Sequence, residues 1–188
     1  MNVINLILDL ANKIVNEQIT LDEAIKIIHS PGIESKLSKR ILSKLYKLSN
    51  KLAIQSLHTT YYLVYLIYEA TKMINNKKFQ GLVAFTLANL SINFAEYHSA
   101  IELYQQSLSV FEELKDKQRI GSSLGSLGNV YNYLGQYQAA ISYYNKALDI
   151  ARETKDLNSE CISLGNLGSA YEYLGQYQKA IDFIERSL

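Results

Sequence analysis

Small and apolar residues recur at intervals of three and four along the second half of the chain, with polar residues between them. Two such stripes lie between residues 121 and 151. Their members are Leu124, Leu127, Gly128 and Tyr131, and then Ala140, Tyr143, Tyr144, Ala147, Leu148 and Ala151. This spacing has the period of an α-helix. Gly135 lies between the stripes and suits a tight turn, so the pattern predicts an antiparallel helical hairpin.

The same pattern returns forty residues later. Residues 121–148 align with residues 161–188, and fifteen of the 28 aligned pairs are identical. A weaker copy begins at Gly81, so the sequence predicts a repeat array over 81–188, with units at 81–120, at 121–160 and, shorter, at 161–188. A fixed period of this length indicates stacked supersecondary units. Such an array presents a surface rather than a catalytic pocket.

Turn and cap residues recur with the units. Gly175 and Ala95 are the counterparts of Gly135, so each is expected at the turn inside a hairpin. Asp116 and Asp156 stand where one unit ends and the next begins. An aspartate at such a position is expected to cap the first helix of the following unit.

Four glycines fall inside the first helices of the units, where each costs about 1 kcal/mol relative to alanine. They are Gly125, Gly128, Gly165 and Gly168. A phosphate-binding loop would need another glycine spacing, a preceding strand and a lysine. We therefore expect these glycines to permit close approach of the paired helix.

These positions match the spaced signature of the tetratricopeptide repeat. The matching residues are Leu124, Leu127, Gly128, Tyr131, Gly135, Tyr137, Ala140, Tyr144 and Ala147, and again Leu164, Leu167, Gly168, Tyr171, Gly175, Tyr177 and Ala180. The forty-residue unit resembles the longer variant of kinesin light chains and Leu-Gly-Asn-repeat adaptor proteins, which is also found in many bacterial and cyanobacterial proteins. The usual repeat has roughly 34 residues, with a Trp where Leu124 stands and a Pro near its end, where Arg152 stands here. The resemblance implies an all-α fold, a right-handed α-α superhelix (solenoid) of antiparallel helical hairpins.

In tetratricopeptide arrays the first helix of each hairpin lines a concave groove, so the resemblance also implies a set of groove residues. The set is Phe85, Asn89, Ile92, Asn93, Asn129, Asn132, Tyr133, Asn166, Ser169, Glu172 and Tyr173. Asparagine amides donate and accept hydrogen bonds and can bracket a peptide backbone. Tyrosines supply rigid apolar area with a polar tip. The alternative interpretation is that these side chains are only solvated.

Residues 41–80 are expected to form a degenerate hairpin of the same kind. The apolar run Tyr61–Tyr68 falls in its second helix. By composition this run could be a strand, since aromatic and β-branched residues favour strands. A lone strand would have no partner here, so we predict a helix.

Residues 1–40 are expected to form an N-terminal helical cap, because the end of an array must hide an apolar face. Two short amphipathic helices are predicted, at Val3–Ile19 and Leu21–His29. Thr20 and Glu23 have the spacing of a capping box at the start of the second helix.

Six basic residues fall in a predicted helix over residues 36–51, and most of them lie on one face of it. They are Lys36, Lys39, Arg40, Lys44, Lys47 and Lys51. A basic amphipathic helix can contact DNA, an acidic membrane or an acidic partner. A solvated helix face explains the same pattern, so this basic patch supports only the alternative function given below.

Candidate catalytic and metal-binding residues are scattered. His29, His58 and His98 fall in different segments, and Cys161 is the one cysteine of the chain. Neither a metal-ligand spacing nor a nucleophile with a nearby base is present. The sequence therefore predicts no cofactor, no metal site and no enzyme activity.

Charge, hydropathy and cysteine content favour a cytoplasmic location. The net charge of +1 gives no overall field that would attract nucleic acid, which makes such a partner unexpected. The apolar N-terminus lacks a basic region and is interrupted by Asp9, so no signal peptide is expected. The longest apolar run, Tyr61–Tyr68, is far shorter than the roughly 20 residues of a membrane span. A single cysteine cannot form an internal disulfide, which fits a reducing compartment.

The sequence thus predicts a non-catalytic protein-interaction module that binds a peptide or partner helix in the concave groove, within a larger scaffold or regulatory protein. The alternative is a regulatory protein that associates with DNA or an acidic membrane through the basic helix. A further expectation is self-association through an apolar face of the last helix, where no following repeat covers Ile181, Ile184 and Leu188.

Overall fold

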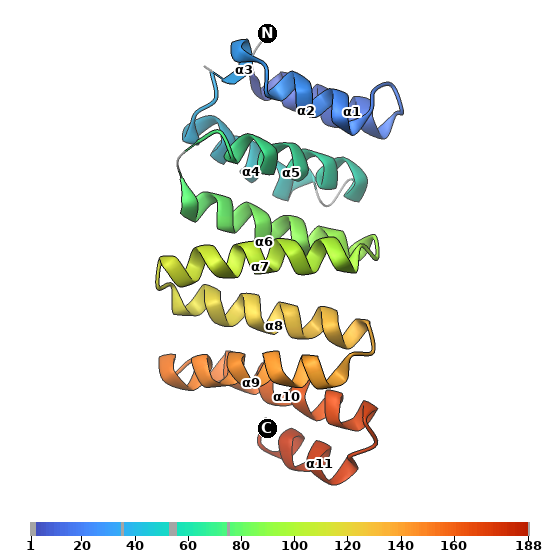
Figure 1. Cartoon of the computed structure of the whole chain (residues 1–188), viewed down its shortest axis with the longest axis vertical. Coiled ribbons are helices and arrows are strands. Elements are labelled where there is room, and N and C mark those ends of the chain that lie inside the picture. Colours follow the sequence, from blue (N-terminus) through green and yellow to red (C-terminus); the bar gives the residue numbers. More distant parts are fainter. Residues whose placement is uncertain (1–2, 35, 53–55, 75, 188) are drawn as a thin grey trace. The chain divides into compact units, whose positions relative to one another are not determined.

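The computed structural model describes residues 3–34, 36–52, 56–74 and 76–187, and every regular element within them is a helix. These helices form two compact units, one ending at Phe94 and the other starting at Ala95. Within each unit the helices pack side by side (Figure 1). The expected all-α fold of stacked helical hairpins is confirmed. None of the described helices is long and apolar enough to cross a membrane.

The first unit is built around helix α5. Its helices are α1 (Val3–Val15), α2 (Leu21–Ile28), α3 (Pro31–Glu34), α4 (Lys39–Leu52), α5 (Leu57–Thr71) and α6 (Lys77–Asn93). Helices α1, α2, α4 and α6 all contact α5. Within α5, the fully buried side chains are those of Leu63, Val64, Leu66, Ile67, Ala70 and Thr71. The run Tyr61–Tyr68 is helical, as predicted, because packing on several sides outweighs its strand propensity.

The first two helices form where they were predicted, but α1 is shorter than predicted. Thr20 caps α2: the Glu23 backbone N donates to Thr20 Oγ1 at 3.2 Å, and the Thr20 N donates to a Glu23 carboxylate oxygen at 2.7 Å. This is the predicted capping box. Helix α1 ends at Val15, before the predicted end at Ile19, because Glu17 turns the chain with a φ of 56°.

The second unit is a stack of helices that follow one another along the chain. They are α7 (Tyr97–Glu113), α8 (Lys117–Tyr133), α9 (Tyr137–Thr154), α10 (Leu157–Tyr173) and α11 (Tyr177–Glu185). Each packs against the next, and α8 also contacts α10. The core between α9 and α10 consists of Ala140, Ile141, Tyr144, Leu148, Leu164, Leu167 and Ala170. The repeat leucines Leu127 and Leu167 are fully buried.

The predicted repeat unit 81–120 corresponds to helices α6 and α7. The boundary between the two compact units, at Phe94 and Ala95, therefore falls inside that repeat. A division into residues 1–40, 41–80 and 81–188 stays a prediction from the sequence.

The turns inside the hairpins use a left-handed backbone conformation at the predicted positions. Gly135 and Gly175 have a φ of 70°, and Ala95 has a φ of 57°. Lys115 and Lys155 adopt the same conformation between hairpins, with φ of 54° and 57°. Glycine reaches this region without steric cost, whereas residues with a Cβ do so at some cost in energy.

The two aspartates between hairpins are helix caps, as predicted. The Arg119 N donates to Asp116 Oδ1 at 3.3 Å at the start of α8. The Ser159 N donates to Asp156 Oδ1 at 3.1 Å at the start of α10. Hydrogen bonds from the Ser159 backbone and side chain hold the pKa of the Asp156 carboxyl below its ordinary value.

The four glycines singled out by the sequence, in α8 and α10, have two different surroundings. A Cβ on Gly128 would lie 2.5 Å from the Tyr144 ring, and one on Gly168 would lie 2.6 Å from Ile184. Close approach of the paired helix requires glycine at these two positions, as predicted. At Gly125 and Gly165 a Cβ would meet nothing within 4 Å. The prediction of close helix approach is therefore wrong for Gly125 and Gly165, whose Cβ positions open into free space.

Candidate functional site

Most of the predicted groove residues of the second unit lie around one cavity. It has a volume of about 290 Å³, and its walls come from three helices of that unit. The lining residues are Asn129, Asn132 and Tyr133 of α8, Tyr144 of α9, and Asn166, Ser169 and Tyr173 of α10. Residues three and four apart share a helix face, which is why the side chains from α8 and those from α10 point into one space.

A hydrogen-bond network joins the floor of this cavity to the core. Tyr144 Oη donates to Asn129 Oδ1 at 2.8 Å, and Asn166 Nδ2 approaches the same oxygen at 3.5 Å. The Tyr144 ring is buried, with 2% of the residue exposed. Burial raises the pKa of the Tyr144 hydroxyl well above its ordinary value, so that the group stays a neutral donor.

Two exposed tyrosines flank the cavity, each supported by a second ring. Tyr133 lies 6.1 Å from Tyr97, measured between ring centroids, and Tyr173 stacks on Tyr137 at 5.1 Å with an angle of 8° between the planes. Tyr133 and Tyr173 are 60% and 64% exposed. Aromatic pairs of this kind restrict ring motion and leave one edge free for a ligand.

The remaining predicted groove residues are not at this cavity. Glu172 is exposed on α10 but does not line it. The other four lie on α6, in the first unit: Phe85 and Ile92 are half-buried, and Asn89 and Asn93 are exposed. The Asn93 side chain donates to the Asn89 carbonyl at 3.1 Å, within α6.

Tyr144 was missed as a candidate site residue, because its place in the apolar stripe marked it only as core. Its hydroxyl nevertheless reaches the cavity wall. A signal was present, since a buried tyrosine hydroxyl usually finds a polar partner. The sequence did not show which polar side chain that partner would be.

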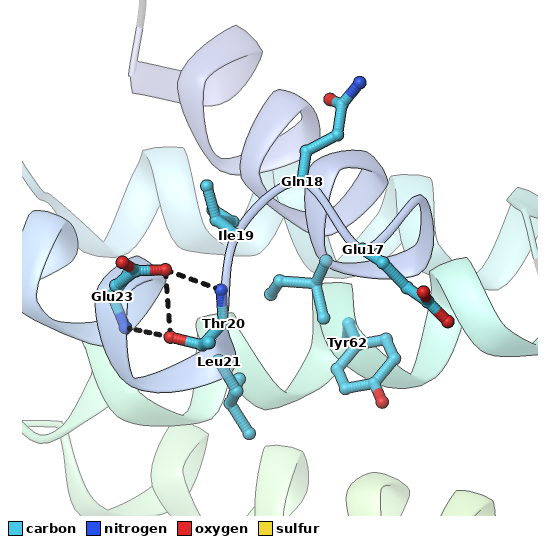
Figure 2. Close-up of a pocket in the computed structure, with 8 residues that line it drawn as sticks. Glu17, Gln18, Ile19, Thr20, Leu21, Glu23 and Tyr62 are labelled. Atoms are coloured by element: carbon cyan, nitrogen blue, oxygen red, sulfur yellow. Dashed lines mark hydrogen bonds between the residues drawn. The ribbon is translucent and has the colours of Figure 1, made fainter.

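A second cavity, of about 410 Å³, lies in the first unit at the turn between α1 and α2 (Figure 2). Its lining includes Glu17, Gln18, Thr20, Glu23 and Tyr62. The Glu23 carboxylate is already held by the Thr20 backbone N and hydroxyl, the dashed contacts of Figure 2, and these hydrogen bonds lower its pKa. Thr20 and Glu23 are thus occupied by capping α2, and none of the predicted groove residues lines this cavity, so it is not the candidate site.

The predicted basic patch is only partly a helix face. Helix α4 begins at Lys39, so Lys36 precedes it, and the predicted helix over 36–51 starts too early. Lys36, Lys44 and Lys47 are exposed. The side chains of Lys39, Arg40 and Lys51 lie outside the described part of the structure.

The apolar face of α11 is partly open. Ile181 is 48% exposed and Ile184 is 42% exposed, whereas Ile141, the counterpart of Ile181 in α9, is 7% exposed beneath α10. Leu188 lies outside the described residues. No group of His, Cys, Asp and Glu side chains in the described segments could hold a metal ion, and Cys161 is exposed.

The stacked hairpins and the polar cavity define a helical-repeat protein with a candidate interaction surface. The family model described as "Tetratricopeptide repeat" matches residues 81–153 and 119–188, more than half of the chain. The chain therefore belongs to the tetratricopeptide repeat family. No curated protein matches the sequence significantly.

Solved structures share this fold at low sequence identity. BtubC (BKLC) from P. vanneervenii has a TM-score of 0.71 and 20% identity over 89% of this chain and 68% of its own. A putative kinesin light chain repeat protein from Podosopora anserina has a TM-score of 0.70 and 18% identity over 100% of this chain and 94% of its own. Aspartyl phosphate phosphatase F from Bacillus subtilis has a TM-score of 0.72 and 23% identity over 89% of this chain, which spans 46% of that protein. The prediction of tetratricopeptide repeats of the kinesin-light-chain type is confirmed, and these similarities extend to the fold alone.

Proposed function

We propose that this chain is a non-catalytic protein-interaction module that holds a peptide or partner helix against the groove face of α8 and α10. The tetratricopeptide fold supports an interaction role in general. The observation that supports this particular surface is the convergence of Asn129, Asn132, Asn166 and the flanking tyrosines on one cavity. Within this proposal the module acts in the cytoplasm, as part of a larger scaffold or regulatory protein.

The chemistry of the surface suits a peptide. Tyr133 and Tyr173 offer exposed rings that each contact a second tyrosine ring, so that less conformational entropy is lost on binding. The asparagine amides between them can hydrogen-bond to a main chain. The lining consists of asparagine, tyrosine and serine side chains only. It contains neither a carboxyl, imidazole, amine or thiol group nor a base next to Ser169 that could activate it for catalysis.

The test is selection of a random dodecapeptide library displayed on phage, with the whole 188-residue chain as bait. Enriched peptides are then synthesised with a fluorescent label, and their dissociation constants are measured by anisotropy. The double variant Asn129→Ala/Asn166→Ala should weaken binding at least tenfold. Asn158→Ala, at an exposed asparagine of α10 away from the cavity, is the matched control and should bind like the wild type. Equal binding by all three proteins, or no enriched sequence, would contradict the proposal.

The alternative function, binding of DNA or an acidic membrane, depends on Lys36, Lys44 and Lys47, which are exposed next to the buried Leu42 and Leu45. Binding of this kind falls steeply with salt. The charge-reversal variant Lys36→Glu/Lys44→Glu/Lys47→Glu should abolish it while leaving peptide binding unchanged. Salt-sensitive binding of the wild type to duplex DNA or to phosphatidylserine vesicles, lost in this variant, would favour the alternative.

A further inference from the structure

The cavity at the turn between α1 and α2 has a chemistry different from that of the groove (Figure 2). Its volume of about 410 Å³ is within the range of small-molecule pockets. Part of its wall is apolar and consists of Ile14, buried near the end of α1, and the half-buried Leu21 and Tyr62. Such a wall favours the hydrocarbon part of a ligand. The polar residues beside it then decide which head group the ligand carries.

The polar part of the lining is acidic. Glu17 and Glu23 each supply a carboxylate, and none of the described residues that line the cavity is basic. Thr20 donates to Glu23 Oε2 twice, from its backbone N at 2.7 Å and from its hydroxyl at 3.0 Å. The Glu17 side chain is exposed and has no such partner among the described residues. Glu17 is therefore the carboxylate with which a ligand can pair.

The nearest lysines along the chain do not line the cavity. Lys13 Nζ pairs with Asp9 Oδ2 at 2.8 Å, on α1. The hydrogen bonds from Thr20 lower the pKa of the Glu23 carboxyl, and the attraction of Lys26 adds less. A cation that enters the cavity thus meets negative charge without a competing ammonium group in the lining.

The backbone around Glu17 favours the same sign of charge. Helix α1 ends at Val15, and Glu17, with a φ of 56°, turns the chain toward α2. The last turn of a helix carries a partial negative charge that favours a cation nearby. The positive end of α2 is already satisfied by the capping box of Thr20 and Glu23. Helix α1 and the Glu17 carboxylate therefore act together on a positively charged ligand.

Tyr62 adds an aromatic face. Figure 2 shows Glu17 and Tyr62 on one side of the cavity and the capping contacts of α2 on the other. An ammonium group is attracted both to a carboxylate and to an aromatic ring, whereas an anion would be repelled by Glu17. We propose that this cavity binds a primary ammonium group on an alkyl stem, with the nitrogen at Glu17 and the stem against the apolar wall. This site is separate from the peptide groove and goes beyond the proposed function.

A metal ion does not suit the site. A hard cation takes several oxygen ligands at once, and no group of His, Cys, Asp and Glu side chains in the described segments could hold one. An alkyl ammonium needs only one carboxylate and gains from the apolar wall as well. It has two sources, a small free amine or the lysine side chain of a partner, and the two share this chemistry.

The experiment is a nuclear magnetic resonance titration of the whole ¹⁵N-labelled chain with four probes. Butylammonium carries the group as a free amine, and N-acetyl-lysine methylamide carries it as a lysine side chain. Butyrate and 1-butanol have a similar stem with a negative and a neutral head group. The backbone amide signals of Gln18, Ile19 and Tyr62 are followed at constant pH and ionic strength. At least one ammonium probe should shift them saturably, and butyrate and butanol should not.

The two ammonium probes distinguish the sources. A response to butylammonium alone identifies a free amine as the ligand. A response to the lysine probe, alone or together with butylammonium, shows that the site accepts a lysine side chain.

Glu17→Gln tests the carboxylate, because it keeps the shape of the side chain and removes its charge. It should weaken binding of the responding probe about fivefold, the upper end for an exposed ion pair. Tyr62→Leu removes the ring and keeps an apolar side chain, and should weaken binding about threefold. Asp22→Asn is the matched control, because Asp22 is an exposed acid at the start of α2 that does not line the cavity; it should bind like the wild type.

Three results would overturn the ammonium site. The first is a shift by butyrate or butanol as strong as that by the ammonium probes. The second is no shift by either ammonium probe at 100 mM. The third is normal binding by Glu17→Gln, or an equal loss of binding in Asp22→Asn. Phage selection on the groove gives its own answer in each case, because none of these variants alters a groove residue.

Discussion

A Cβ atom on Gly128 would lie 2.5 Å from the ring of Tyr144, so the first helix of this hairpin can approach the second only because residue 128 has no side chain. Gly125, one turn earlier on the same helix, has no such neighbour. Both glycines lower the stability of the helix by the same intrinsic amount, but only Gly128 is needed for helix packing. They form a matched pair for mutagenesis.

Gly125→Ala should stabilise the protein by about 1 kcal/mol, the gain in helix propensity. Gly128→Ala should destabilise it by about 1–2 kcal/mol, because overpacking against a buried ring exceeds that gain. Urea denaturation followed by circular dichroism measures both. If the two variants shift the midpoint in the same direction, the assigned packing of α8 against α9 is wrong.

This pair also marks the limit of what the sequence could predict. The spacing of three and four, the period of forty and the turn glycines were sufficient for the helices and the repeat, because these patterns reflect local geometry. Which side of α8 faces α9 depends on the crossing of the two helices, so Gly125 and Gly128 could not be told apart. The same holds for Tyr144: its place in the core was predictable, but the direction of its hydroxyl toward Asn129 depends on how deeply the ring enters between α8 and α10.

Leu127→Ala and Leu167→Ala should each cost roughly 2–5 kcal/mol, because both leucines are fully buried between helices and the substitution leaves a cavity. The exposed Leu157, on the same helix as Leu167, provides a control, since Leu157→Ala should change stability little. Thermal and urea denaturation give the values. Wild-type stability in the Leu127 or Leu167 variants would refute the repeat register.

Stability should fall at alkaline pH through two buried tyrosines. Burial raises the pKa of Tyr104 to about 12, and it raises that of Tyr144 as well. A tyrosine with a raised folded-state pKa favours the neutral form, so its contribution is complete below the unfolded value of about 10 and is lost as pH rises from there toward the folded value. The contribution of these two tyrosines to the free energy of unfolding should therefore stay constant from about pH 7 to 9 and decline above about pH 10.

Urea denaturation at several pH values between 8 and 11.5 tests this expectation. The double variant Tyr104→Phe/Tyr144→Phe should decline less steeply above pH 10 than the wild type, and Tyr177→Phe, at an exposed position, should decline like the wild type. Identical pH profiles for the double variant and the wild type would show that these hydroxyls do not ionise on unfolding as proposed.

Self-association through α11 remains a prediction, and the burial pattern identifies Ile181 as the residue to test. Ile181 is 48% exposed, although its counterpart Ile141 is covered by α10 and is only 7% exposed. An apolar face whose counterpart in the preceding repeat is covered by α10 should attract an equivalent surface, and a second copy of α11 offers one. Sedimentation equilibrium of the wild type should then show a monomer–dimer exchange at tens of micromolar, and Ile181→Glu should be monomeric because a buried unpaired carboxylate is costly. Ile162→Glu places the same charge at an exposed isoleucine of α10 and should dimerise normally. A wild type that stays monomeric at all concentrations, or an Ile162→Glu variant that loses dimerisation while Ile181→Glu keeps it, would exclude α11 as the interface.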